Sequence, residues 1–132
     1  MKNKDLLSYA LDALKNSYSP YSNYKVGAAI LLNNGKIIKG VNIENASYGL
    51  TNCAERSALF TAYSLGYRKE DIKGIAIASL STPPASPCGA CRQVINELMN
   101  NNAFVIYGNN QDEIYETTVG ELLQSAFNKE CL

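Results

Sequence analysis

The segment from Ile72 to Leu80 constrains the fold of this chain most, because nearly all of its residues are apolar or small. A strand of this composition is buried on both faces, as in the interior of a sheet that has helices on either side. Helical patterns flank the segment, one at residues 52–65 and one at residues 86–99. Strands that alternate with helices predict an α/β fold with a partly parallel sheet covered on both faces.

The rest of the chain supplies the other elements of such a sheet. Residues 25–32 and 36–41 are predicted strands, and Asn34-Gly35 between them is a strong signal for a two-residue hairpin turn. Residues 103–107 and 114–118 bring the predicted strands to five. The predicted helices cover residues 5–18, 52–65, 86–99 and 119–127, with Asn3, Asn52 and Ser86 at the positions of their caps.

Length and charge limit the classes of partner. The 132 residues have a mass of 14.4 kDa, which predicts a single domain over residues 1–132. Twelve basic and twelve acidic side chains balance, so long nucleic acid is not an expected partner. The apolar runs are too short to span a bilayer and the N-terminus lacks the apolar core of a signal peptide, so we expect a cytoplasmic protein without membrane contact.

The absence of histidine restricts the chemistry more than any other count. Without an imidazole, the chain cannot contain a Ser-His-Asp triad, a Cys-His pair or an HExxH metal site. Acid-base chemistry must then fall to carboxylate, lysine, tyrosine or thiolate. The chain has four cysteines and no export signal, which favours metal binding or redox chemistry over a disulfide framework.

Three of the cysteines lie where two predicted helices begin. Cys88 and Cys91 are three residues apart, a spacing that places both on one helix face, and Cys53 holds the equivalent place in the helix before. The N–H groups and dipoles at the two helix starts favour ionised sulfur. Three thiolates would leave the fourth position of a tetrahedral zinc ion open to water, as in a catalytic site.

Charged residues close to these cysteines suggest further roles. Glu55 is not needed as a ligand, so it can stand beside a metal-bound water as a general base. Arg56 and Arg92 each follow a ligand closely and could donate hydrogen bonds to sulfur, Arg56 being the stronger candidate.

Other interpretations of the same residues stay open. Cys88 and Cys91 alone also fit a thioredoxin-like redox pair or half of a structural zinc site, which would recruit Cys131 from the polar C-terminal segment. Glu55 could be a capping-box glutamate three residues after Asn52. The run Asn42-Ile43-Glu44-Asn45 could be a polar strand end.

Several motifs together resemble the zinc-dependent cytidine deaminases, specifically the small homotetrameric kind with three cysteine ligands. Cys53-Ala54-Glu55 and Pro87-Cys88-Gly89-Ala90-Cys91 carry the likeness at the metal. The segments 19–29, 40–46, 52–56 and 86–94 resemble the family in the same order, so the likeness covers nearly the whole chain.

The resemblance implies a fold, a reaction and a set of residues. The fold would be a three-layer α/β/α sandwich with a mixed five-stranded sheet. The reaction would be hydrolytic deamination of cytidine and deoxycytidine in pyrimidine salvage, with zinc-bound hydroxide attacking C4 and Glu55 shuttling protons. One Zn²⁺ per chain would be held by Cys53, Cys88 and Cys91, with Arg56 and Arg92 around them. The resemblance further implies pyrimidine nucleoside contacts from Tyr24, Asn42, Glu44 and Ala54, and contacts to a neighbouring subunit's site from Tyr48 and Phe127.

Two departures from the family pattern stand out. The family commonly has phenylalanine where this chain has Tyr24, whose ring can still stack and whose hydroxyl could form a further hydrogen bond or restrict the pocket. Residues 122–127 differ from the family's usual leucine-leucine-proline run, which affects the role expected of Phe127. Among related enzymes, a blasticidin S deaminase resembles the chain at the metal, whereas Asn42 and Glu44 favour a nucleoside.

Overall fold

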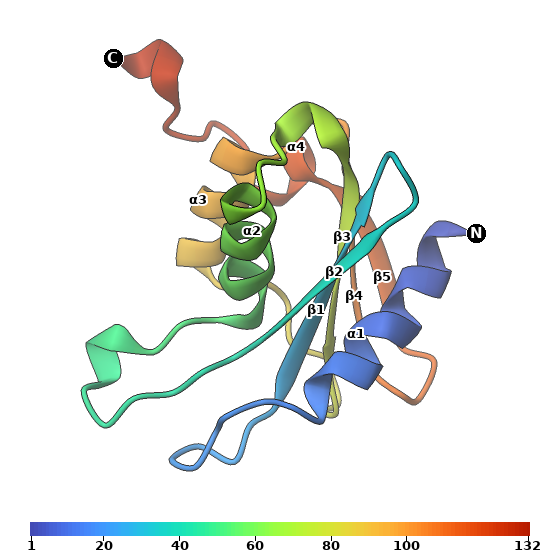
Figure 1. Cartoon of the computed structure of the whole chain (residues 1–132), viewed down its shortest axis with the longest axis vertical. Helices are drawn as coiled ribbons and strands as arrows, with labels where there is room; N and C mark the ends of the chain where they lie inside the picture. The colour runs from blue at the N-terminus through green and yellow to red at the C-terminus, as the bar shows by residue number, and fades with distance from the viewer.

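The computed structural model describes all 132 residues and shows a five-stranded sheet with helices on both faces (Figure 1). The strands are β1 (Val26–Leu32), β2 (Ile37–Val41), β3 (Ile72–Ser79), β4 (Phe104–Gly108) and β5 (Ile114–Thr118). The α-helices are α1 (Leu6–Leu14), α2 (Ala54–Ser64), α3 (Gly89–Leu98) and α4 (Val119–Leu122). Four 3₁₀ turns complete the chain: η1 (Asn3–Asp5), η2 (Tyr48–Leu50), η3 (Lys69–Asp71) and η4 (Lys129–Cys131).

The sheet is mixed, as the resemblance implied. Its strand order is β2-β1-β3-β4-β5, in which β3 and β4 are parallel and every other neighbouring pair is antiparallel. The strand β3 occupies the centre and is buried except at Lys73. The apolar segment that dominates the sequence therefore forms the middle of the sheet.

Two apolar clusters hold the three layers together. On one face α1 packs Leu6, Leu7 and Ala10 against small residues of the sheet. On the other face α2 and α3 contribute Leu59 and Ile95 to a larger cluster. From the two strands it includes Ala28, Ile30 and Leu32 of β1 and Ile72, Ile75 and Ile77 of β3. Figure 1 shows α1 on the opposite side of the sheet from α2 and α3. The three-layer α/β/α arrangement is confirmed.

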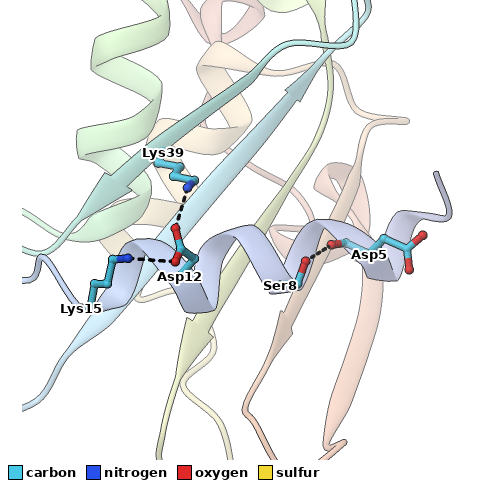
Figure 2. A network of polar contacts seen from close by, with 5 residues as sticks. All are labelled: Asp5, Ser8, Asp12, Lys15 and Lys39. Atoms are coloured by element: carbon cyan, nitrogen blue, oxygen red, sulfur yellow. Dashed lines mark hydrogen bonds and ion pairs between the residues drawn. The ribbon is translucent and has the colours of Figure 1, made fainter.

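A polar contact ties α1 to the edge of the sheet (Figure 2). Asp12 accepts hydrogen bonds from Lys39 of β2 at 2.8 Å and from Lys15 at 3.1 Å. Hydrogen bonds from the two lysines, together with their charges, lower the pKa of Asp12.

Two helices are shorter than their apolar patterns predict. The first ends at Leu14 rather than near Tyr18, because the Tyr18 N–H donates to Asn42 O and begins a bridge to residue 43. The last ends at Leu122 rather than at Phe127, since the chain turns through Ser125 at a φ of 54°. The prediction of a helix over residues 119–127 is therefore correct only for its first turn and wrong for residues 123–127.

The hairpin between β1 and β2 differs from the predicted two-residue turn. Leu32 N–H donates to Lys36 O and Gly35 N–H to Leu32 O, which leaves Asn33, Asn34 and Gly35 in the loop. Only Gly35 has a positive φ, 88°, whereas a type I′ turn needs two such residues.

None of the helices has both the length and the apolar composition needed to cross a membrane.

Candidate metal centre and pocket

Two helix starts face each other on one side of the sheet and bring the three predicted cysteines together. Cys53 is the N-cap of α2, Cys88 is the N-cap of α3, and Cys91 follows one turn into α3. The predicted caps Asn52 and Ser86 are wrong. The Asn52 backbone pairs with Ile43 in both directions and so stays extended, and helix α3 begins only after Cys88, whose sulfur accepts the Cys91 N–H.

The three sulfurs form a cluster that suits one metal ion. They lie within 4.8 Å of one another, and the Cys53 and Cys88 sulfurs are 4.0 Å apart. Two ligands of a tetrahedral zinc ion with Zn–S bonds of about 2.3 Å stand roughly 3.8 Å apart. All three thiols are free, and they come from two rigid helix starts. The donor set therefore fits zinc with small shifts. Cys131 is exposed in η4 and outside the cluster, so a four-cysteine site does not form.

The electrostatics of the cluster favour ionised sulfur at Cys53. A hydrogen bond from the Cys91 thiol, followed by the hydrogen bond and charge of Arg56, lowers the pKa of Cys53 to about 5. The same contact with Cys53, followed by burial, raises the pKa of Cys91. One sulfur of the group is therefore a thiolate at neutral pH, which is the form that binds metal.

Glu55 lies in the first turn of α2 and is only 4% exposed. Burial is the main reason that its pKa is raised. The capping-box alternative does not hold, because Cys53 is the cap and the Asn52 N–H donates to Ile43 O. Glu55 thus combines a protonatable carboxylate with a position beside the sulfur cluster.

The two arginines act on different parts of the site. Arg56 donates to the Cys53 sulfur at 3.2 Å, and its buried Nε has no partner. Arg92 does not reach sulfur, contrary to the prediction. It donates to Pro87 O in the loop before α3 at 2.7 Å and to Leu122 O at the end of α4 at 2.8 Å, so its guanidinium group joins these two segments. Arg92 therefore supports the backbone next to Cys88.

A pocket of about 300 Å³ opens in front of Cys53, Glu55 and Cys88. All four residues predicted to contact a nucleoside line it: Tyr24, Asn42, Glu44 and Ala54. Its other lining residues are Ser22, Val26, Thr51, Asn52 and Ser86. The fold thus gathers residues from four separate segments of the chain into one cavity, while their roles stay predictions.

Asn42 and Glu44 are held in place by neighbours that the sequence did not indicate. The Asn42 side chain accepts from Ser17 Oγ and from Val26 N–H and donates to Tyr24 O. The Glu44 carboxylate accepts from the backbone N–H groups of Tyr21 and Ser22 and from Ser22 Oγ. The bond from the Ser22 hydroxyl lowers the pKa of Glu44. No pattern marks Ser17 or Ser22, because single serines in loops are common.

Tyr48 and Phe127 lie outside this pocket and are 76% and 60% exposed. Tyr48 meets Tyr21 edge to face, with ring centroids 6.1 Å apart. Phe127 belongs to the C-terminal segment, where its carbonyl accepts from Gln93 Nε2 at 2.8 Å. Neither ring reaches the sulfur cluster of its own chain.

Comparison with known proteins gives a consistent result. The sequence pattern of the family described as "Cytidine and deoxycytidylate deaminase zinc-binding region" matches residues 1–108. A cytidine deaminase of Halalkalibacterium halodurans is 52% identical over 130 residues, which is 98% of this chain and 97% of that protein. A cytidine deaminase of Sporosarcina psychrophila is 47% identical over 127 residues, or 96% of this chain and 92% of that protein.

The fold is shared as well. A crystal structure of cytidine deaminase from Burkholderia pseudomallei has a TM-score of 0.92 and 47% identity, covering 96% of this chain and 100% of that one. The cytidine deaminase of Mycobacterium leprae has a TM-score of 0.79 and 35% identity, covering 95% of this chain and all of that one. With the three-sulfur cluster and Glu55 in place, these matches show that the chain belongs to the cytidine and deoxycytidylate deaminase family.

Proposed function

We propose that this protein catalyses the hydrolytic deamination of cytidine and deoxycytidine to uridine and deoxyuridine, with release of ammonia. The observation that carries the proposal is one pocket lined by Glu55, Cys53 and Cys88 together with Asn42 and Glu44, with Cys91 in the same sulfur cluster. The relatives at 52% and 47% identity are cytidine deaminases over nearly their whole length.

The cysteine cluster supplies the metal chemistry of this reaction. Cys53, Cys88 and Cys91 would hold one zinc ion, and the bound ion would supply the Lewis acidity that makes water acidic enough to act as a nucleophile near neutral pH. Arg56 donates to the Cys53 sulfur and offsets part of the negative charge of three thiolates.

Glu55 carries the protons. Its carboxylate lies in the pocket next to Cys53 and belongs to no capping interaction. In our proposal a carboxylate oxygen of Glu55 takes one proton from the attacking water and gives it to N3 of the base. It then takes the remaining proton from the new hydroxyl on C4 and gives it to the amine, so that ammonia leaves as the C4 carbonyl forms. A positioned acid-base group of this kind contributes about 10²–10⁴ to the rate.

Asn42 and Glu44 each keep one unused hydrogen-bonding site, and together these sites are what a sugar hydroxyl requires. Asn42 has spent both oxygen lone pairs and one of its two amide hydrogens, which leaves one N–H to donate. Glu44 has used three of roughly four acceptor sites, which leaves one to accept. A hydroxyl group both accepts and donates, so the pair matches the sugar. Tyr24 and the Ala54 backbone would contact the pyrimidine.

The charge of the pocket favours a nucleoside over a nucleotide. No lysine or arginine lines it, whereas Glu44 and Glu55 both do. A 5′-phosphate would enter without a cationic partner and close to a carboxylate, which costs binding free energy. We therefore expect cytidine and deoxycytidine to be preferred to their monophosphates.

The proposal also covers the setting of the reaction. Pyrimidine salvage in the cytoplasm, by one domain that assembles as a homotetramer, rests on the resemblance to the family. The exposed rings of Tyr48 and Phe127 support an assembly in which they meet a neighbouring subunit.

The test is ammonia release from cytidine, deoxycytidine, CMP, adenosine and blasticidin S, with zinc content determined on the same preparation. We expect turnover of the two cytosine nucleosides alone and one zinc per chain. The variant Glu55→Gln should keep its zinc and lose about 10²–10⁴ in turnover, whereas the exposed Glu70→Gln should match the wild type. A fully active Glu55→Gln variant would disprove the proton-carrying role.

A further inference from the structure

Tyr24 joins two loops at one end of the sheet. It precedes β1, and its hydroxyl is 2.7 Å from the hydroxyl of Ser81, which follows β3. Since Val26 pairs with Ser79 in the antiparallel β1–β3 ladder, the two loops leave the same end of neighbouring strands. Tyr24 also lines the pocket, so this contact connects a pocket wall to the loop between β3 and α3.

The direction of each hydrogen bond in this group can be assigned. Ser81 Oγ is 2.8 Å from Pro83 O, and because a carbonyl only accepts, the single Ser81 proton goes there. The Tyr24 hydroxyl must therefore donate to Ser81. Ser79 Oγ accepts the Ala85 N–H at 2.9 Å, which leaves the Ser79 proton to donate to Ser81 at 3.2 Å. Ser81 Oγ thus has one donor bond and two acceptor bonds, which is its full capacity.

The hydrogen-bonded group of Tyr24, Ser81, Ser79 and Ala85 ends close in sequence to the metal-binding residues. Ala85 is followed by Ser86, which lines the pocket, and then by Pro87 and Cys88. The side chain of Ser79 is fully buried in β3, so the group is anchored in the sheet. The Tyr24 hydroxyl therefore holds the loop of residues 80–88 from the side of the pocket.

We propose that Tyr24 is a positioning residue whose hydroxyl, through Ser81, fixes both its own ring and the 80–88 loop before the nucleoside binds. This inference rests on the proposed function. A phenylalanine would supply the ring but leave the Ser81 oxygen with one acceptor bond fewer. A pocket that is ordered before binding loses less conformational entropy when the substrate binds. Loss of the Tyr24 hydroxyl should therefore weaken substrate affinity and leave the chemical step unchanged.

The experiment compares Tyr24→Phe, Ser81→Ala and the double variant with Ser81→Thr, which keeps a hydroxyl. The control is Tyr115→Phe, which removes a hydroxyl from an exposed β5 ring outside the pocket. Two quantities are measured on the zinc-loaded protein: KM and kcat for cytidine, and the hydrogen-exchange rate of the Ala85 amide without substrate.

We expect Tyr24→Phe, which loses one hydrogen bond, to raise KM about three- to tenfold. Ser81→Ala loses that bond together with its bonds to Ser79 and Pro83, so it should raise KM at least as much, and both variants should keep kcat within about twofold. The double variant should resemble Ser81→Ala rather than multiply the two effects. Ala85 exchange should accelerate by a similar factor in all three. Ser81→Thr and Tyr115→Phe should match the wild type in both measurements.

Unchanged KM and unchanged Ala85 exchange in Tyr24→Phe would overturn the inference while leaving the deaminase activity intact. A fall in kcat at constant KM would also overturn it, because the hydroxyl would then act in the chemical step. Failure of the wild type to release ammonia from cytidine would instead remove the proposed function, and Ala85 exchange would still show whether Tyr24 holds the loop.

Discussion

Short hydroxyl side chains hold much of this pocket in place. Ser17 and Ser22 each bond to a residue that the sequence singled out, Asn42 and Glu44 respectively. Such contacts fix the rotamer of the longer side chain and leave only part of its bonding capacity free. The chemistry of each long side chain therefore depends on what its neighbours have left unused.

Replacement of Glu44 by glutamine tests this dependence. In Glu44→Gln the amide oxygen can still accept the Tyr21 and Ser22 N–H bonds. An NH₂ group replaces the other oxygen, which accepts from Ser22 Oγ and which the sugar would meet. We expect KM for cytidine to rise about tenfold or more, as for a hydrogen bond to a charged group, with kcat and zinc content little changed. Steady-state kinetics with Glu70→Gln as the control measures this. An unchanged KM would show that Glu44 only organises the loop at residues 21–22.

At the scale of the elements, local sequence predicted the strands better than the helix starts. Runs of apolar and β-branched residues place all five strands within a residue or two, and the pattern is strongest in β1 and β3, which are largely buried. Asn52 and Ser86 are good caps by composition, yet both helices begin at a cysteine instead. Pairing of Asn52 with Ile43, across the intervening η2 segment, decides the first of these starts.

At Gly40, β2 packs so closely against α2 that no side chain would fit between them. A Cβ there would lie 2.4 Å from Ala58 N and 2.7 Å from Ala54 O, which are backbone atoms of α2. Gly40→Ala must therefore push away the helix that carries Cys53 and Glu55. We expect a loss of about 1–3 kcal/mol in unfolding free energy, together with lower zinc content and turnover.

Urea unfolding and metal analysis measure both effects. Gly120→Ala is the matched control, because a Cβ there would meet its nearest neighbour at an ordinary 3.5 Å. A Gly40→Ala variant as stable and as zinc-rich as the wild type would mean that α2 can shift without disturbing the sulfur cluster.

The attachment of α1 to β2 through Asp12 should depend on pH (Figure 2). Lys39 and Lys15 lower the pKa of Asp12 in the folded protein relative to its unfolded value. The stabilisation is therefore complete above the unfolded pKa, near 4, and is lost as the pH falls through the lower folded pKa. Asp12→Asn should lower the melting temperature by a few degrees at most at pH 7, and the difference should shrink toward pH 3.5. Asp112→Asn, at a position without side-chain bonds, should show no such pH-dependent difference.

For the molecule as a whole, the η2 segment carries two exposed apolar side chains close together in the sequence. Tyr48 and Leu50 are 76% and 71% exposed, and Figure 1 shows their segment far from the sheet. Exposed apolar groups on a projecting segment are typical of surfaces that another chain covers. The family resemblance makes further copies of this chain the expected cover.

We therefore expect light scattering of the wild type to give four times the chain mass of 14.4 kDa at micromolar concentration. The double variant Tyr48→Ser with Leu50→Ser removes apolar area from the proposed interface, so it should dissociate to smaller species. Leu132→Ser is the control. Leu132 is 94% exposed at the C-terminus, so this substitution removes an exposed apolar side chain outside the proposed interface. A wild type that elutes at the mass of one chain would refute the assembly, and a double variant that stays tetrameric would place the interface away from η2.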